Sequence, residues 1–173
     1  IGAGGIADTR TIPGILEARN AELVALTART PERAEQLRRK HGAKRAYTSE
    51  EELLRDPEVD AVYIATPVAE HYREGTLATQ AGKHILMEKP LTVSADETKA
   101  LIDCCEAHKV AFGAGFMMRF GTHVQSMRRA VLDGRIGTVL SGTANFTLWM
   151  PYQSGVWRLQ KKNGGGALMD MGI

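Results

Sequence analysis

The sequence predicts an α/β protein built on a doubly wound parallel sheet. Up to about residue 120, short apolar runs alternate with amphipathic segments, which is the order expected of strands and helices in such a sheet. A glycine-rich turn stands at residues 1–7, and the apolar run 84–87 ends in the charged pair Glu88-Lys89. Ligands of open α/β sheets bind outside the carboxyl ends of the strands, so the sequence places its binding site there.

Composition restricts the class of protein. The 173 residues are 43% hydrophobic and 24% charged, with a formal net charge of +2, and the sequence holds no dense block of Lys and Arg. These values argue against a nucleic acid or a membrane surface as partner. Adjacent Cys104 and Cys105 lack metal-ligand spacing, so we expect a cytoplasmic protein without a metal site. The chain starts at Ile1 without Met or a leader, which predicts a fragment.

Residues 1–7 match the pattern G-x-G-x-x-A, with Gly2, Gly4 and Ala7 at its fixed positions. In a dinucleotide-binding unit the first glycine makes a tight turn and the second lets the backbone approach a pyrophosphate, while the small third residue packs helix on strand. Ile1 alone represents the strand that should precede this turn. A helix is expected over 6–18, broken or restarted at a proline.

The apolar run 21–27 is where the second strand of such a unit belongs, and the residues after it predict the cofactor. An acidic residue there would bind the ribose 2′-hydroxyl, whereas a basic residue accommodates a 2′-phosphate. The sequence has Arg29 and then Arg33, with no carboxylate before Glu32. It therefore favours NADP over NAD. The alternative is that Arg29 faces water and that either cofactor binds.

Capping residues mark the further helices. Thr30-Pro31 and two capping boxes, which begin at Ser49 and Ser94, precede amphipathic segments, and Gly42 follows the first of them. We expect helices over 31–41, 50–55, 71–81, 95–108 and 122–133.

The run 60–65 is almost continuously apolar and predicts a strand buried on both faces. Thr66 closes this strand. His71, which opens the next helix, either contacts the cofactor or lies at the surface.

Lys89 is the first candidate for chemistry, because it ends the strand 84–87 and Pro90 after it holds it extended. The alternative is a solvated lysine at a strand end. A cis Lys89-Pro90 bond is open on sequence alone. Another strand is expected over 110–118, with Arg119 at its carboxyl end.

The architecture changes after this point. Run 138–148 alternates polar and apolar residues, which is typical of a strand with one wet face. We therefore expect a nucleotide-binding domain over residues 1–120 and the beginning of a second domain, with an open-faced and mainly antiparallel sheet, over residues 121–173.

Four blocks along the chain then resemble the Gfo/Idh/MocA family, the glucose-fructose oxidoreductases, inositol dehydrogenases and their relatives. The blocks are 2–7, 62–67 with His71, 81–91, and Trp157-Arg158 with 164–170. The resemblance implies a Rossmann domain, NAD(P) as cofactor, and the interconversion of hydroxyl and carbonyl groups on sugars, polyols or diols. Residues 134–137 and 157–159 look like the NADP-dependent sugar reductases of the family.

The resemblance also implies roles for single residues. Lys89 would hold the reacting oxygen and assist proton movement, and Asp170 would orient the substrate. A histidine or tyrosine four residues beyond Asp170 would be the general acid/base, at a position after Ile173. With Gly2 from the glycine pattern, the implied cofactor contacts are Gly4, Gly5, Ile6, Ala7, Arg29, Arg33, Thr66, His71, Glu88, Lys89, Arg119, Trp157 and Arg158.

The expected partner is a small sugar-type or polyol-type molecule, and we expect the whole protein to form a homo-oligomer. The rival interpretation is a sensor or regulator that binds NAD(P) without turnover. Retention of Lys89 and Asp170 favours the enzyme. Without its first strand and most of its second domain, this segment alone is expected to be inactive.

Overall fold

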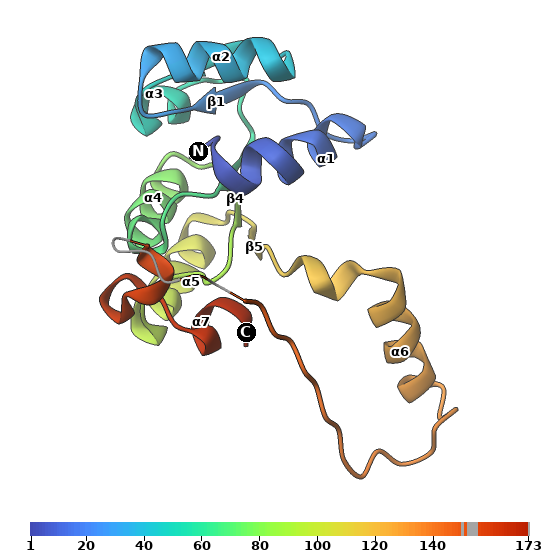
Figure 1. The fold of residues 1–173 in the computed structure, drawn as a ribbon. Coiled ribbons are helices and arrows are strands. Elements are labelled where there is room, and N and C mark those ends of the chain that lie inside the picture. Colours follow the sequence, from blue (N-terminus) through green and yellow to red (C-terminus); the bar gives the residue numbers. More distant parts are fainter. Residues whose placement is uncertain (150, 152–155, 173) are drawn as a thin grey trace.

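The computed structural model describes residues 1–149, 151 and 156–172 (Figure 1). The strands are β1 (Ala25–Thr27), β2 (Arg45–Tyr47), β3 (Ala61–Ile64), β4 (His84–Met87) and β5 (Phe112–Ala114). The α-helices are α1 (Ile12–Glu17), α2 (Pro31–His41), α3 (Glu50–Leu54), α4 (Val68–Gln80), α5 (Ala95–His108), α6 (Thr122–Leu132) and α7 (Ala167–Met171). A π-helical turn, η1 (Ala7–Thr11), and the 3-10 turns η2 (Met117–Phe120), η3 (Trp157–Leu159) and η4 (Lys161–Asn163) complete the set. None of the described helices is long and apolar enough to cross a membrane.

All described strand pairs are parallel, as the alternation of strands and helices predicted. They form a two-stranded sheet, β1-β2, and a three-stranded sheet, β3-β4-β5. The first residues of the chain lie between the two sheets: the Ala3 amide donates to the Thr27 carbonyl (3.0 Å), and the Ala65 amide donates to the Ile1 carbonyl (3.1 Å). This short segment therefore sets the distance between β1 and β3.

The predicted helix caps are confirmed. Thr30 accepts a hydrogen bond from the Arg33 amide, Ser49 from the Glu52 amide, and Ser94 from the Glu97 amide. Gly42 ends α2 with φ of 71°, in the left-handed region where glycine is favoured. The predicted restart of the first helix is also confirmed, because α1 begins after η1 with proline in its first turn.

The expectation that the strand 60–65 is buried on both faces is wrong. Val62 and Ile64 of β3 are buried, but Ala61 is exposed and Tyr63 is half-buried. On that face lies a cavity of about 450 Å³, which the side chains of Tyr63 and Leu86 line together with residues of β1, η1 and α1. This face of β3 is covered only in part, because Tyr63 packs against the core cluster that contains Ala3, Ala7 and Ile12.

Two other strand predictions need correction. The run 110–118 forms only the short β5, and the chain then turns into η2, which carries Arg119. The run 138–148 pairs with no strand among the described residues. It runs as an exposed chain from the end of α6 back toward α7 (Figure 1), and along this course it meets no described sheet edge that could offer backbone partners.

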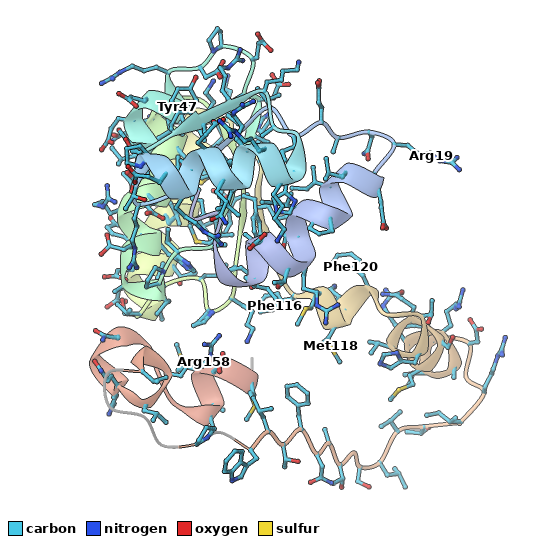
Figure 2. All side chains as sticks on the ribbon, turned by 45° about the horizontal axis from the view of Figure 1, so that its top comes forward. Arg19, Tyr47, Phe116, Met118, Phe120 and Arg158 are labelled. Carbon is cyan, nitrogen blue, oxygen red and sulfur yellow. The ribbon has the colours of Figure 1, made fainter. Side chains whose placement is uncertain are left out.

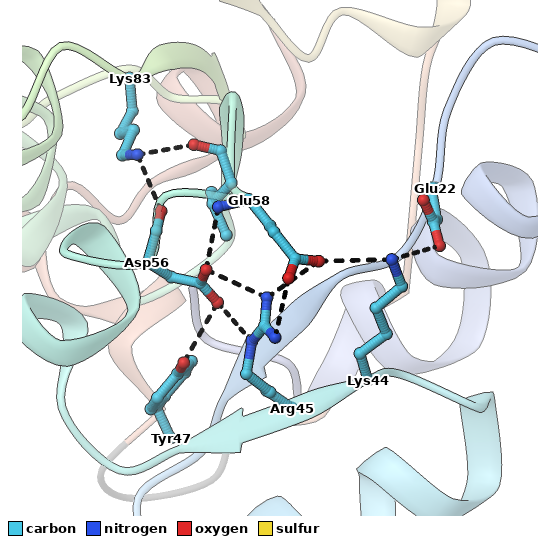
Figure 3. Close-up of polar contacts among 8 residues, drawn as sticks. Glu22, Lys44, Arg45, Tyr47, Asp56, Glu58 and Lys83 are labelled. Carbon is cyan, nitrogen blue, oxygen red and sulfur yellow. Dashed lines mark hydrogen bonds and ion pairs between the residues drawn. The ribbon is translucent and has the colours of Figure 1, made fainter.

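A hydrogen-bonded ion cluster fixes the end of the sheet at which the strands begin (Figure 3). The Asp56 carboxylate accepts from Arg45 Nε (2.6 Å), the Tyr47 hydroxyl (3.1 Å) and the Glu58 amide (3.0 Å). Burial opposes ionisation of Asp56, but these donors outweigh it and lower the pKa of the carboxyl. Lys83 Nζ donates to the Asp56 carbonyl (3.0 Å), which ties the start of β4 to the same cluster.

The core between β4, α4 and α5 requires a glycine. A Cβ atom on Gly75 would lie 2.8 Å from Leu101 Cδ2 and 2.9 Å from Met87 Cε. Leu101 and Met87 are both fully buried, so neither can move into free space.

We therefore predict that Gly75→Val lowers the free energy of unfolding by about 1–3 kcal/mol, because overpacking displaces buried side chains. Urea denaturation of the intact protein measures this change in the free energy of unfolding. Ala69→Val is the control, because it adds a β-branched residue to an exposed position of the same helix. An equal loss in both variants would contradict the packing argument.

Candidate functional site

A pocket of about 770 Å³ opens at the carboxyl ends of β1, β3 and β4. Its volume lies within the range of about 300–1,000 Å³ that small-molecule sites occupy. Many of the residues that the sequence analysis predicted for the site line this pocket. They are Gly2, Gly4, Gly5, Ile6, Arg29, Arg33, Thr66, His71, Glu88, Lys89 and Arg158. Ala7 does not line this pocket; it is buried beneath the loop, in the core with Leu26 and Leu37.

The glycine-rich loop has the two properties that a dinucleotide requires. Gly2 has φ of +73°, and a Cβ there would lie 2.7 Å from Thr66 Cγ2, so the turn admits no side chain. At Gly4 and Gly5 a Cβ would meet no atom within 4 Å. The backbone of this part of the loop is therefore open to the pocket, where a pyrophosphate can approach it.

The cation Arg33 is held in place beside the pocket. Its Nη2 lies 3.1 Å from Asp8 Oδ2, and its Nη1 donates to Gln36 Oε1 (2.7 Å). Asp8 also accepts from Lys40 Nζ (2.6 Å), and hydrogen bonds from Lys40 and then His41 lower the pKa of the Asp8 carboxyl. The sequence analysis missed Asp8, because no local pattern relates it to an arginine 25 positions away.

The two residues predicted for catalysis lie together. Lys89 Nζ is 3.1 Å from Asp170 Oδ1 and also donates to the backbone carbonyl of Asp170. Arg158 Nε lies 3.1 Å from the second carboxylate oxygen of Asp170. Figure 2 shows Arg158 on the C-terminal segment, which also carries Asp170, so the contact of Lys89 with Asp170 joins this segment to the α/β body. The Lys89-Pro90 peptide bond is cis.

His71 is fully buried, so the surface alternative for this residue is wrong. Its Nε2 lies 2.9 Å from the Thr66 carbonyl, and its Nδ1 lies 3.0 Å from the Pro90 carbonyl and 3.1 Å from that of Leu91. The ring therefore connects the segment after β3 with the segment after β4. A direct contact of His71 with the cofactor stays a prediction.

The structure does not place the side chains of Arg119 and Trp157, two predicted cofactor contacts, in the pocket lining. Arg119 is exposed on η2 and is not part of the pocket lining, although Met117 of the same turn is. Figure 2 shows the neighbouring Met118 and Phe120 on this turn. The side chain of Trp157 lies outside what the structure describes. Both contacts stay predictions.

A buried carboxyl that the sequence analysis missed lies under the pocket. Glu74 on α4 is almost inaccessible, and the Thr66 hydroxyl donates a hydrogen bond to it. Burial raises the pKa of Glu74 to about 7, against the hydrogen bond from Thr66 and with a further contribution from Glu50. Its place three residues after His71, on the same helix face, was the available signal.

This pKa gives a test with a defined sign. Folded Glu74 keeps a proton that the unfolded chain has lost, so its contribution to stability falls as pH rises from 4.5 to about 7. We predict that Glu74→Gln removes this loss, so that the variant gains thermal stability over the wild type across this window. Glu70→Gln, at an exposed position of the same helix, is the control. Parallel stability curves for wild type and Glu74→Gln would contradict the assignment.

Comparison with known proteins gives matches along the whole chain. The GFO/IDH/MocA description "Oxidoreductase family, NAD-binding Rossmann fold" matches residues 1–116, and the GFO/IDH/MocA C-terminal domain matches residues 124–173. The 1,5-anhydro-D-fructose reductase of Ensifer adhaerens is 34% identical over 175 residues, which cover 100% of this chain and 52% of the relative. D-xylose 1-dehydrogenase (NADP(+)) 2 of Haloferax volcanii is 38% identical over 99% of this chain and 52% of its own.

Solved structures agree with these matches. KijD10, a 3-ketoreductase from Actinomadura kijaniata in complex with NADP and TDP-benzene, superposes with a TM-score of 0.87 and 30% identity, over 99% of this chain and 52% of that one. The chain thus spans about half the length of the curated relatives it matches.

Proposed function

Because this chain belongs to the GFO/IDH/MocA oxidoreductase family, we propose that its protein is an NAD(P)-dependent oxidoreductase that interconverts a hydroxyl and a carbonyl on a sugar, polyol or diol. The observation that carries this proposal is the contact between Lys89 and Asp170 at the pocket (3.1 Å). Relatives named as sugar reductases and dehydrogenases support the substrate class.

The residues at the pocket fit a dinucleotide, with NADP preferred and NAD possible. The open backbone at Gly4 and Gly5 suits a pyrophosphate, and Arg29 and Arg33 supply positive charge where the strand β1 ends. A carboxylate there would instead favour the ribose hydroxyls of NAD. When bound, the cofactor supplies the hydride chemistry.

The residues of the chain supply position and charge. A lysine ammonium has three N–H donors, and among the described contacts Lys89 gives two of them to Asp170. The third can stabilise the negative charge that develops on the substrate oxygen. Asp170 keeps the ammonium oriented, and Arg158 keeps Asp170 in place.

We propose that residues 1–120 form the nucleotide-binding domain and that residues 121–173 begin the substrate domain. The change of family description between residues 116 and 124 supports this division. We further propose a cytoplasmic homo-oligomer, on the family resemblance.

The first prediction from this proposal concerns Lys89→Ala in the intact protein. Turnover should fall about 10²- to 10⁴-fold, because the variant loses proton assistance and charge stabilisation, while NADPH affinity stays within about threefold. NADPH fluorescence titration and a panel of sugar-type carbonyls and polyols measure both quantities. Lys83→Ala is the control, because Lys83 also donates two hydrogen bonds, in its case to two backbone carbonyls, but lies outside the pocket.

Unchanged turnover in Lys89→Ala would overturn the role of this lysine. If the wild type binds NADPH but turns over nothing in the panel in either direction, the sensor interpretation replaces the enzyme.

The second prediction concerns the cofactor. Arg29→Asp should weaken NADPH binding about tenfold or more and NADH binding much less, because only NADPH carries a 2′-phosphate. Arg19→Asp makes the same charge change on an exposed loop after α1 (Figure 2) and should affect neither. Equal losses for NADPH and NADH in Arg29→Asp would contradict the preference for NADP.

A further inference from the structure

We propose that Tyr63 is a positioning residue of the cofactor site, whose hydroxyl fixes the carboxylate of Glu88 from behind the pocket. This inference rests on the proposed function, because it assigns Glu88 to the cofactor site. Tyr63 does not line the pocket itself, and the sequence analysis gave it no role.

The register of the sheet brings the two side chains to one face. Tyr63 pairs with Leu86 across β3 and β4. Side chains alternate along a strand, so Glu88, two positions beyond Leu86, points to the same face as Tyr63. The phenol ring can therefore reach the carboxylate diagonally across the pair of strands. The Tyr63 hydroxyl lies 2.5 Å from Glu88 Oε1.

The direction of the hydrogen bonds is fixed by chemistry. An ionised carboxylate only accepts, so Tyr63 donates to Glu88, and its oxygen accepts from the Thr11 hydroxyl (3.0 Å). Burial and then the hydrogen bond to Glu88 raise the pKa of the Tyr63 hydroxyl, so it remains a donor at neutral pH. This series of bonds links η1 to the end of β4.

Glu88 is consequently held at both oxygens. Oε1 accepts from Tyr63, and Oε2 accepts from the Lys89 amide (3.2 Å). Glu88 lines the 770 Å³ pocket, whereas Tyr63 lines the 450 Å³ cavity between the sheets, so the bond joins the pocket wall to the interior. A carboxylate held in this way beside Lys89 presents a fixed acceptor to an N–H group, such as the carboxamide of a nicotinamide.

The chain offers a matched control for testing Tyr63. Tyr47 also donates its hydroxyl to a carboxylate, that of Asp56 (3.1 Å), in the ion cluster outside the pocket (Figure 3). Tyr63→Phe and Tyr47→Phe each delete one oxygen and one bond to a carboxylate, and Tyr63→Phe also loses the bond from Thr11, so its loss of stability should be equal to that of Tyr47→Phe or somewhat larger. Only Tyr63→Phe should change cofactor binding.

The measurement is NADPH fluorescence titration of the intact protein. We expect Tyr63→Phe to weaken NADPH binding about tenfold, because Glu88 loses its fixed position. In a Glu88→Gln background, Tyr63→Phe should cost nothing further, because it acts through that carboxylate.

Equal NADPH affinity in wild type and Tyr63→Phe, or an undiminished effect in the Glu88→Gln background, would overturn the inference and leave the proposed function standing. A wild-type protein that binds neither NADPH nor NADH would overturn the proposed function, and the inference with it.

Discussion

The parallel pairing of β3 with β4 is the constraint on which the site depends. Parallel strands bring their carboxyl ends to one edge of the sheet, and here that edge carries Thr66, Glu88 and Lys89. Because the pairing alone leaves the segments beyond each strand free to move, other groups must hold them. His71 contacts carbonyl groups on both segments, and Tyr63 holds Glu88. The side chains in the pocket are therefore positioned by His71 in its wall and by Tyr63 behind it.

Three poorly accessible carboxyl groups show how the protein uses charge at the two ends of the sheet. Asp56 is surrounded by donors, so it is ionised and fixes the start of the strands. Asp8 is ionised for the same reason and holds Arg33 beside the pocket. Glu74 accepts from the Thr66 hydroxyl and lies 3.6 Å from the Arg73 guanidinium, but burial and the neighbouring carboxyl of Glu50 outweigh them and raise its pKa. The balance between burial and the donors and charges around each carboxyl therefore decides the direction in which its pKa moves.

Local sequence predicted those parts of the fold that local interactions determine. Caps such as Thr30 and Ser94 are confirmed because their hydrogen bonds lie within a few residues. The exposed face of β3 and the unpaired run 138–148 were not predicted, since both depend on whether another segment packs there. The same limit applied to Asp8, Glu74 and Tyr63, whose partners lie far away in the sequence or on another element.

The contact between Lys89 and Asp170 differs, because it spans 81 residues and yet joins two residues that the sequence analysis had assigned to one site. That assignment came from the resemblance of two sequence motifs to the family, because no local physical rule relates the two residues. The structure shows how two residues so far apart in the sequence come together. Lys89 ends a strand of the rigid sheet, whereas Asp170 lies on α7, in the segment that follows the extended run. An ion pair between them orients the ammonium only while the two parts of the chain lie together. The proposed role of Lys89 therefore requires the C-terminal segment to lie against the sheet.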